Sequence, residues 1–236
     1  YNIEITGSTP NDGEYFWNIP EARYPDVTYT GCRIRARDAN DISVEKKMTT
    51  SFEIKPVLWV THPQGETWQV GSSKDITWDY YGTISNVRIE YSEDGVTWPG
   101  TGDYLVSAGT PASAKSKSWT VPDTMSDDCV MRISRVGGTA VTDDSNTAFS
   151  IKPKIVVNEP LGGAVRANGT TDIKWTTTGT LEPLGTVKLK YVVDAGEPVV
   201  IAAAGDRASP DGVQQSYTWT IPDIASNNVQ ALVVAN

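Results

Sequence analysis

Ser118-Trp119-Thr120-Val121-Pro122-Asp123 decides the fold, because closely similar stretches occur twice more in the chain. Phe16-Trp17-Asn18-Ile19-Pro20-Glu21 lies near the N-terminus, and Thr218-Trp219-Thr220-Ile221-Pro222-Asp223 lies near the C-terminus. The tryptophans at positions 17, 119 and 219 are 102 and 100 residues apart. A recurrence at this spacing predicts tandem copies of one domain of about a hundred residues.

Each copy of this motif is typical of a β-strand that ends at its proline. Trp and Val or Ile stand two positions apart, so they point to the same face of the strand. Proline then ends the pairing because it has no N–H to donate, and the acidic residue suits a turn. We therefore expect five tryptophans that recur in register to lie in the domain cores. They are Trp17, Trp78, Trp119, Trp175 and Trp219.

The composition excludes some classes of partner. The 236 residues include 20 Lys and Arg against 29 Asp and Glu, a net charge of −9. Nucleic acids and anionic membranes require clustered positive charge, so we expect neither as a partner. No run of about 18 apolar residues occurs, so we expect no membrane insertion in this segment.

The motif spacing divides the chain into three copies. Residues 1–56 are expected to form the C-terminal strands of a partial repeat, and residues 57–153 a complete one. Residues 154–236 form a repeat that stops before the strand matching Ala148–Ile151 in the complete copy. We interpret the chain as part of a longer protein. Either the polypeptide continues past Asn236 or another segment fills the place of that last strand, since a sandwich without it exposes a sheet edge.

Short alternating segments separated by turn signals predict an all-β, antiparallel sandwich with almost no helix. In residues 57–153 the expected strands are Val57–Val60, Thr67–Val70, Asp75–Trp78, Val87–Tyr91, Thr97–Trp98 continuing towards Tyr104–Val106, Lys117–Val121, Cys129–Ser134 and Ala148–Ile151. In residues 1–56 they are Tyr1–Ile5, Phe16–Pro20, Cys32–Ala36 and Thr50–Ile54. In residues 154–236 they are Ile155–Val157, Asp172–Trp175, Val187–Tyr191, Tyr217–Ile221 and Val229–Val234.

The links between copies are short. Ile54-Lys55-Pro56-Val57 and Ile151-Lys152-Pro153-Lys154 pass from one copy to the next with only Lys-Pro between the expected strands. Proline fixes its own φ and favours extended geometry at the preceding residue. The sequence therefore predicts a semi-rigid rod that lengthens by roughly 35–45 Å per repeat.

A longer string of residues in the complete copy carries a resemblance to known domains. It comprises Thr61–Gly71, Asp75–Trp78, Val87–Tyr91, Ser92–Trp98, Trp119–Pro122 and Phe149–Ile151. This string resembles the tandem Ig-like or fibronectin-III-like repeat of large secreted bacterial and archaeal surface proteins. It is also similar to the Ser/Thr-rich cell-wall and GPI-anchored protein domain family. The resemblance implies Ig-like sandwiches at an extracellular or cell-surface location, and it implies no particular activity.

The cysteines and the histidine give little support to catalysis. Cys32 and Cys129 stand at equivalent places, and Val229 replaces them in the third copy, so each is expected to act as a small buried hydrophobe. His62 is the one histidine, so at most one His-dependent triad could be assembled. We expect no enzymatic activity from this segment.

Acidic residues after the Trp119 strand suggest one candidate metal site. Asp123, Asp127 and Asp128 lie in a loop that would meet the next repeat, and carboxylates are the ligands that calcium prefers. Asn227 and Asn228 replace the last two in the third copy, and no DxDxDG loop is present. The expectation is no cofactor, with calcium at the junction as the alternative and solvated acidic turns as the simpler interpretation.

Aromatic residues suggest a second candidate site, for carbohydrate. Trp59, Trp68 and Trp98 are candidates for stacking on sugar rings, and the third copy lacks aromatic counterparts of Trp68 and Trp98. Ser92–Trp98 also looks like the Asp-box hairpin, in which Asp and Ser tie the turn and Trp packs beneath it.

Repeats, charge and links together favour a structural segment of a long extracellular repeat protein, which forms a stalk, fibre or cell-surface appendage. The expected partners are adjacent repeats and other copies of the same chain. The alternative is a carbohydrate-binding or adhesive module that contacts glycans or a partner cell surface.

Overall fold

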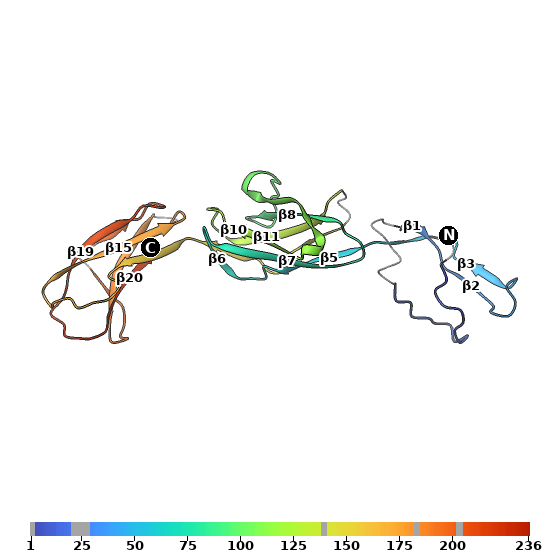
Figure 1. The fold of residues 1–236 in the computed structure, drawn as a ribbon, viewed down its shortest axis with the longest axis horizontal. Helices are drawn as coiled ribbons and strands as arrows, with labels where there is room; N and C mark the ends of the chain where they lie inside the picture. The colour runs from blue at the N-terminus through green and yellow to red at the C-terminus, as the bar shows by residue number, and fades with distance from the viewer. Residues whose placement is uncertain (1–2, 20–28, 138–140, 182–184, 202–204) are drawn as a thin grey trace.

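The computed structural model describes residues 3–19, 29–137, 141–181, 185–201 and 205–236. Figure 1 shows three groups of strands in a row along the long axis of the molecule, joined by single crossings of the chain. Helix in these described residues is limited to two 3-10 turns, η2 (Gly102–Tyr104) and η3 (Ala112–Ala114). The chain is therefore all-β, as its alternating pattern predicts.

The central unit is a sandwich of two sheets. One sheet has the order β10-β7-β5 and the other β6-β13-β11-β8-β9, with β12 also paired to β11. All of these pairs are antiparallel except β6 with β13, which is parallel. The bounds are β5 (Val57–His62), β6 (Thr67–Gln69), β7 (Ser73–Tyr81), β8 (Asn86–Ser92), β9 (Leu105–Pro111), β10 (Ser116–Thr120), β11 (Ser126–Arg135), β12 (Thr142–Asp144) and β13 (Phe149–Lys152).

Alternation along these strands builds the central core. Cys129, Met131 and Ile133 on β11 are 0 % exposed and share one face with the buried residues of β8 and β13. Trp78 is 2 % exposed, and its indole Nε1 donates to the backbone oxygen of Ala112 at 3.0 Å. Because the ring is buried and its one polar atom is satisfied, Trp78 stabilises the unit by several kcal/mol, about 3–5.

The third unit repeats this plan with fewer strands. One sheet has the order β14-β15-β19, and in the other β16 pairs with β17, β18 and β20. Trp175 occupies the place of Trp78, is 1 % exposed, and donates through Nε1 to Ser209 Oγ at 2.9 Å. The bounds are β14 (Lys154–Glu159), β15 (Thr170–Thr178), β16 (Thr186–Val193), β17 (Val199–Val200), β18 (Asp206–Ala208), β19 (Gln215–Thr220) and β20 (Val229–Ala235).

The first unit contains two strand pairs, β1 with β4 and β2 with β3. The expected strand at Phe16–Pro20 is wrong over residues 16–19, which are irregular, with Phe16 86 % exposed; Pro20 lies outside the described residues. In the central unit the corresponding strand β10 pairs with β7, and residues 3–19 and 29–56 contain no strand that could replace β7. The bounds are β1 (Tyr29–Cys32), β2 (Arg35–Arg37), β3 (Glu45–Lys47) and β4 (Phe52–Ile54).

Other expected strands need correction at the edges. Of the strand expected at Tyr1–Ile5, residues 1 and 2 lie outside the described residues, and residues 3–5 are irregular. Thr97 and Trp98 are irregular too, because the turn at Asp94 is followed by η2 before β9 begins at Leu105. The short strands β12, β17 and β18 were not anticipated, since two or three residues carry too little alternation to be recognised.

Candidate functional site

The junction between the central and third units is the best-defined candidate site. Strand β13 ends at Lys152 and β14 begins at Lys154, so Pro153 alone separates them. At the preceding junction β4 ends at Ile54 and β5 begins at Val57. Since proline fixes its own φ, links this short leave little freedom for one unit to swing against the next.

Polar contacts cross the junction directly. Asp123, the acidic residue of the tryptophan motif, accepts hydrogen bonds from the backbone N–H of Thr180 at 3.1 Å and from its hydroxyl at 3.2 Å. Thr180 follows β15 of the third unit. These bonds lie at the surface, so each contributes only about 0.5–1.5 kcal/mol. They set an orientation rather than provide strong adhesion.

Glycines allow the two units to approach closely. Gly179 has φ +90, and a Cβ placed on it would lie 2.9 Å from Val70 Cγ2 and 3.1 Å from Asp123 Oδ1. Its N–H donates to Asp211 Oδ1 at 2.7 Å, which holds it against the third unit. On the other side, a Cβ on Gly71 would lie 3.3 Å from Thr178 Cγ2. The joint formed by Val70, Gly71, Asp123 and Thr178–Thr180 therefore has no room for larger residues at Gly179.

The preceding junction uses the same device. Gly82 stands 97 residues before Gly179, the offset that also relates Trp78 to Trp175. It has φ +82, and a Cβ on it would lie 3.0 Å from Pro56 Cβ and 3.1 Å from Pro56 Cα. A glycine thus packs against the preceding unit or its link at both junctions.

The candidate calcium ligands do not converge. Asp123 is engaged with Thr180, and Asp127 forms an ion pair with Lys152 at 2.6 Å. The hydrogen bonds from Lys152 and Ser150 hold the pKa of the Asp127 carboxyl below its usual range. Asp128 is exposed, and its backbone N–H donates to a neighbouring serine. The described part of the chain holds no group of three or more His, Cys, Asp or Glu side chains arranged around one point.

The carbohydrate hypothesis is wrong about Trp68, which lies in the core and not at the surface. It is 1 % exposed, and its ring centroid lies 4.8 Å from that of Phe149 and 5.9 Å from that of Trp119. Its strand β6 pairs with β13, which brings Phe149 over it. With both faces inside the core, Trp68 has no surface on which a sugar could stack.

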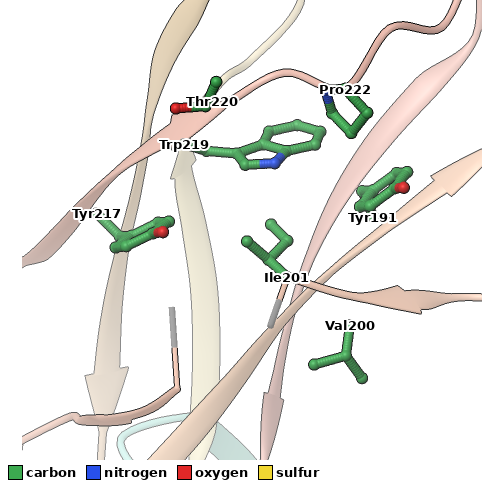
Figure 2. Close-up of a pocket in the computed structure, with 7 residues that line it drawn as sticks. All are labelled: Tyr191, Val200, Ile201, Tyr217, Trp219, Thr220 and Pro222. Carbon is green, nitrogen blue, oxygen red and sulfur yellow. The ribbon is translucent and has the colours of Figure 1, made fainter. Parts of the chain in front are cut away.

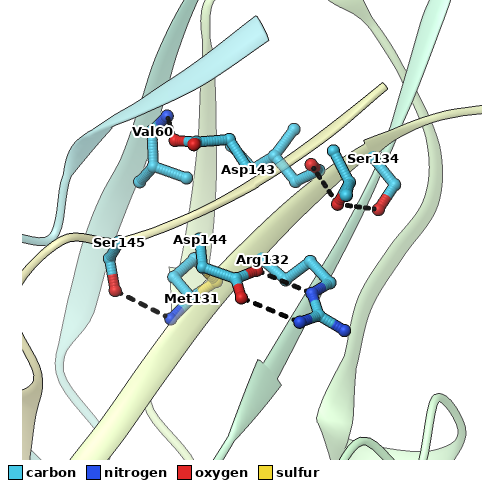
Figure 3. A network of polar contacts seen from close by, with 9 residues as sticks. Val60, Met131, Arg132, Ser134, Asp143, Asp144 and Ser145 are labelled. Carbon is cyan, nitrogen blue, oxygen red and sulfur yellow. Dashed lines mark hydrogen bonds and ion pairs between the residues drawn. The ribbon is translucent and has the colours of Figure 1, made fainter. Parts of the chain in front are cut away.

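Trp98 and Trp59 remain near the surface. Arg132 lies over the Trp98 ring, with Cζ 3.7 Å from the centroid. Asp144 holds that guanidinium through two bonds of 2.6 and 2.8 Å (Figure 3). One face of Trp98 is therefore already covered by a cation. Trp59 is half-buried, and its ring lies 5.2 Å from that of Tyr81, which is 67 % exposed.

The turn before Trp98 is built by Asp94. Its Oδ1 accepts from Val96 N at 2.8 Å and Thr97 N at 2.6 Å, and Ser92 Oγ donates to the same oxygen at 2.8 Å. The backbone hydrogen bonds from Thr97 and Val96 hold the pKa of Asp94 well below its usual range. The resemblance to the Asp box therefore concerns the hydrogen bonds with which Asp94 closes this turn, and these bonds stabilise the fold.

Asp143 and Asp144, which lie on β12, also have structural roles. Asp143 Oδ2 accepts from the backbone N–H of Val60 at 2.9 Å, which ties β12 to β5 of the opposite sheet (Figure 3). Ser145 Oγ accepts from Met131 N at 3.1 Å within the core. Sequence reasoning missed these bonds, because β12 is three residues long and its partners are distant in the chain.

The third unit contains a small surface pocket of about 230 Å³ with a mixed polar and apolar lining. Figure 2 shows Trp219 above Ile201, with Tyr191 and Tyr217 on either side. In the central unit Tyr104 stacks on Tyr91 at 5.2 Å, and no aromatic residue of the described third unit takes that place on Tyr191. The pocket borders the Tyr191 ring. Its lining residues are Tyr191, Val200, Ile201, Tyr217, Trp219, Thr220 and Pro222.

The five tryptophans expected in cores differ in how deeply they are buried. Trp78, Trp175 and Trp219 are at most 4 % exposed. Trp119 is partly buried against the central core, with its ring 4.9 Å from that of Tyr91. Trp17 is half-buried, and neither described core cluster includes it.

Comparison with known proteins bears on the fold. No protein-family model and no curated protein sequence matches the chain. A solved marsupial T cell receptor is similar over 77 % of this chain and 68 % of its own, at 13 % identity and a TM-score of 0.25. The N-terminal eight Ig domains of Down Syndrome Cell Adhesion Molecule are similar at 11 % identity and a TM-score of 0.27. That likeness covers 88 % of this chain and 31 % of the other.

These likenesses are too distant to indicate a function, and the assignment of an Ig-like fold rests on the strand order of the central unit. The described residues contain no helix that is long and apolar enough to cross a membrane.

Proposed function

We propose that this chain is a structural segment of a long extracellular repeat protein, which forms a stalk, fibre or cell-surface appendage of the kind found in large secreted bacterial and archaeal proteins. The joint around Gly179 carries the proposal. A one-residue link, a glycine packed against Val70 and two hydrogen bonds to Asp123 are features expected where relative orientation matters.

The mechanism would be mechanical. The central and third units each have their own core, so units of this kind can be added without changing the fold of their neighbours. Short links and direct contacts would then transmit orientation from unit to unit and hold whatever lies at the tip away from the cell. Adjacent repeats and other copies of the chain are the proposed partners. We propose no catalysis, and His62 Nδ1 lies 2.8 Å from Glu66 Oε1 in a local pair.

Small-angle X-ray scattering tests the rod. A compact globule of this length would have a radius of gyration of about 18 Å. Three units in a row, about 100 Å long, would give a value near 30 Å. We expect the larger value, unchanged by moderate salt. A value close to that of the globule would show that the units fold back on one another and would refute the proposal.

An adhesive function is the second candidate, supported by the half-buried Trp59 beside the exposed Tyr81. Flat rings at the surface of a sheet can stack on sugars or on a partner protein. Glycan-array binding that is lost in Trp59→Ala and retained in Trp98→Ala, with both variants folded, would favour this function. Absence of binding by the unaltered chain would count against it.

A further inference from the structure

Three aromatic rings of the third unit surround the pocket drawn in Figure 2. Trp219 and Tyr217 come from β19, and Tyr191 comes from β16 of the opposite sheet. The ring centroids of Tyr191 and Trp219 are 5.1 Å apart, and the two planes are tilted by 35°. The pocket is therefore an aromatic slot between the edges of the two sheets.

The polar groups on these rings are donors without an acceptor. Among the described residues, no hydrogen bond is made by the hydroxyls of Tyr191 and Tyr217 or by Nε1 of Trp219. Trp219 is only 4 % exposed, and Figure 2 shows its nitrogen on the edge of the ring that faces Ile201. Each of the three groups can donate a hydrogen bond to a ligand in the pocket.

The central unit satisfies the equivalent groups with its own side chains. Tyr104 stacks on Tyr91 with ring centroids 5.2 Å apart, and the Tyr91 hydroxyl bonds to Thr124 Oγ1 at 2.7 Å. Ile224 stands 100 residues after Thr124, so the Tyr191 hydroxyl has no such partner. The third unit therefore keeps the tyrosine of this site and lacks the groups that occupy it.

Tyr217 is a ring that the central unit does not have at this position. Lys117 stands there, 100 residues earlier. Arg207 lies over the Tyr217 ring, with Cζ 4.6 Å from the centroid, and holds the ring against the pocket. The Nε of Arg207 is buried and has no acceptor among the described residues. A further unsatisfied donor thus lies beside Tyr217.

The pocket is separate from the edge of β20 and from the end face of the unit. Its lining residues belong to β16, β17, β19 and the segments that directly follow β17 and β19. The joint residues Val70, Gly71 and Asp123 correspond to positions 167, 168 and 223 here, and none of these lines the pocket. Its shape is set by strands that are paired, β16 with β17 and β19 with β15.

The lining favours one class of ligand. A sugar brings hydroxyl donors as well as acceptors, and no carboxylate or amide side chain lines the pocket to receive those donors. A proline residue brings a compact apolar ring and carbonyl acceptors, and it has no N–H that would need a partner. Polyproline II segments are also extended before they bind, and they dock in aromatic-lined grooves.

We propose that this pocket binds a proline-containing segment of another protein in the polyproline II conformation. One proline ring lies between Tyr191 and Tyr217 and against Trp219. The carbonyl groups beside that proline accept hydrogen bonds from Trp219 Nε1 and from the tyrosine hydroxyls. A pocket of about 230 Å³ has room for one such ring and its adjoining backbone. The proposal goes beyond the mechanical function, because it gives the third unit a partner of stated chemistry.

Nuclear magnetic resonance of the 236-residue chain tests the proposal. The probe is a synthetic oligoproline of about eight residues, and an oligoalanine of the same length is the control. Oligoproline should shift the indole N–H signal of Trp219 in a saturable way, with a dissociation constant of about 1 mM or lower. The indole signals of the central unit should stay in place.

Two variants of the pocket and one matched control separate binding from folding. Tyr217→Lys gives the third unit the residue that the central unit has at position 117, so the variant should stay folded while binding weakens at least about fivefold. Tyr191→Phe removes one hydroxyl and should weaken binding about twofold to tenfold. Lys117→Tyr makes the reverse exchange in the central unit and should leave binding unchanged, because Tyr104 already covers Tyr91 there.

Three results would overturn the proposal: no shift at several millimolar oligoproline, equal binding of oligoalanine, or full binding by folded Tyr217→Lys. Saturable binding of maltotriose without binding of oligoproline would also overturn it, and would assign the pocket to carbohydrate. The radius of gyration of the peptide-free chain decides the mechanical function separately, so the two proposals can fail independently.

Discussion

Gly179→Ala is the most direct test of the joint. The new Cβ would lie 2.9 Å from Val70 Cγ2 and 3.1 Å from Val70 Cβ, where carbon atoms normally stay about 3.5–4.0 Å apart. Val70 is 6 % exposed and belongs to the central core, so it cannot easily move away. The third unit can relieve the clash only by moving off the central unit.

The size of that movement follows from the geometry. The new Cβ separates the two units by about 1 Å at one side of their contact face. If this face is about 10 Å wide, the spacing of two packed sheets, the third unit tilts by about 6°. Over a unit about 40 Å long, this tilt displaces the far end by about 4 Å. The strained backbone at φ +90 adds a cost of about 1–2 kcal/mol within the third unit itself.

A glycine elsewhere separates these two effects. Gly137 of the central unit has φ +87, and nothing lies within 4 Å of a Cβ placed on it. Gly137→Ala should therefore carry the backbone cost without any wedge. Both variants should lower the melting temperature by a few degrees, and only Gly179→Ala should change the angle between units.

Electron–electron double resonance measures that angle. Spin labels at exposed Ser113 in the central unit and Ser216 in the third would be placed in a Cys32→Ser, Cys129→Val background. Gly179→Ala should shift the mean distance by several ångström and broaden its distribution. An unchanged distribution in folded Gly179→Ala, or an equal change in Gly137→Ala, would refute the reasoning about the joint.

Four further predictions follow from the same contacts. Asp123→Ala removes the bonds to Thr180, so it should broaden the same distance distribution while lowering stability by about 1 kcal/mol or less; Asp128→Ala should do neither. Calcium or a chelator should leave the melting temperature and the distance distribution unchanged, because Asp123 is used in the joint; a rise of several degrees with calcium would contradict this. Trp78→Ala should destabilise the central unit by about 3–5 kcal/mol in urea unfolding, and a loss below about 1 kcal/mol would show that the ring is not central to the core. Burial raises the pKa of Cys129 to about 12 from an ordinary value of 9, so its thiol should resist alkylation at about pH 8. The contribution of the protonated thiol to stability should be complete below about pH 9 and lost as the pH rises towards 12. Rapid labelling of Cys129 in the folded chain would contradict this prediction.

Local pattern was enough to predict the long strands. β7, β8 and β11 each alternate over seven or more residues, and their apolar positions point into one core. Trp68 was misjudged because its strand is three residues long and its burial depends on Phe149, far along the chain. The missing aromatic in the third unit suggested a dispensable surface ring. The structure shows instead that the ring belongs with a particular neighbouring strand.

The joint could not have been predicted from periodicity. Its contacts are between residues of different units, and a glycine in a turn has the same sequence signature whether open space or a neighbouring unit lies beyond it. Gly137 and Gly179 have nearly the same φ, and only the structure shows that the second is packed against Val70. The short Lys-Pro links did indicate stiffness, but they gave no orientation.

The tryptophan motif recurs because it serves both the core and the joint. Val121 exchanges backbone bonds with the turn before β7, from Gly71 N to Val121 O and from Val121 N to Ser72 O, both at 2.9 Å. These bonds place Asp123 at the end of the central unit, where its carboxylate accepts a hydrogen bond from the backbone N–H of Thr180. In the third unit Ile221 makes the equivalent bonds with the turn before β15, at 3.1 and 2.8 Å. Asp223 is then presented at the far end in the same way, so the acceptor that would orient a following unit is already part of the strand that closes the core.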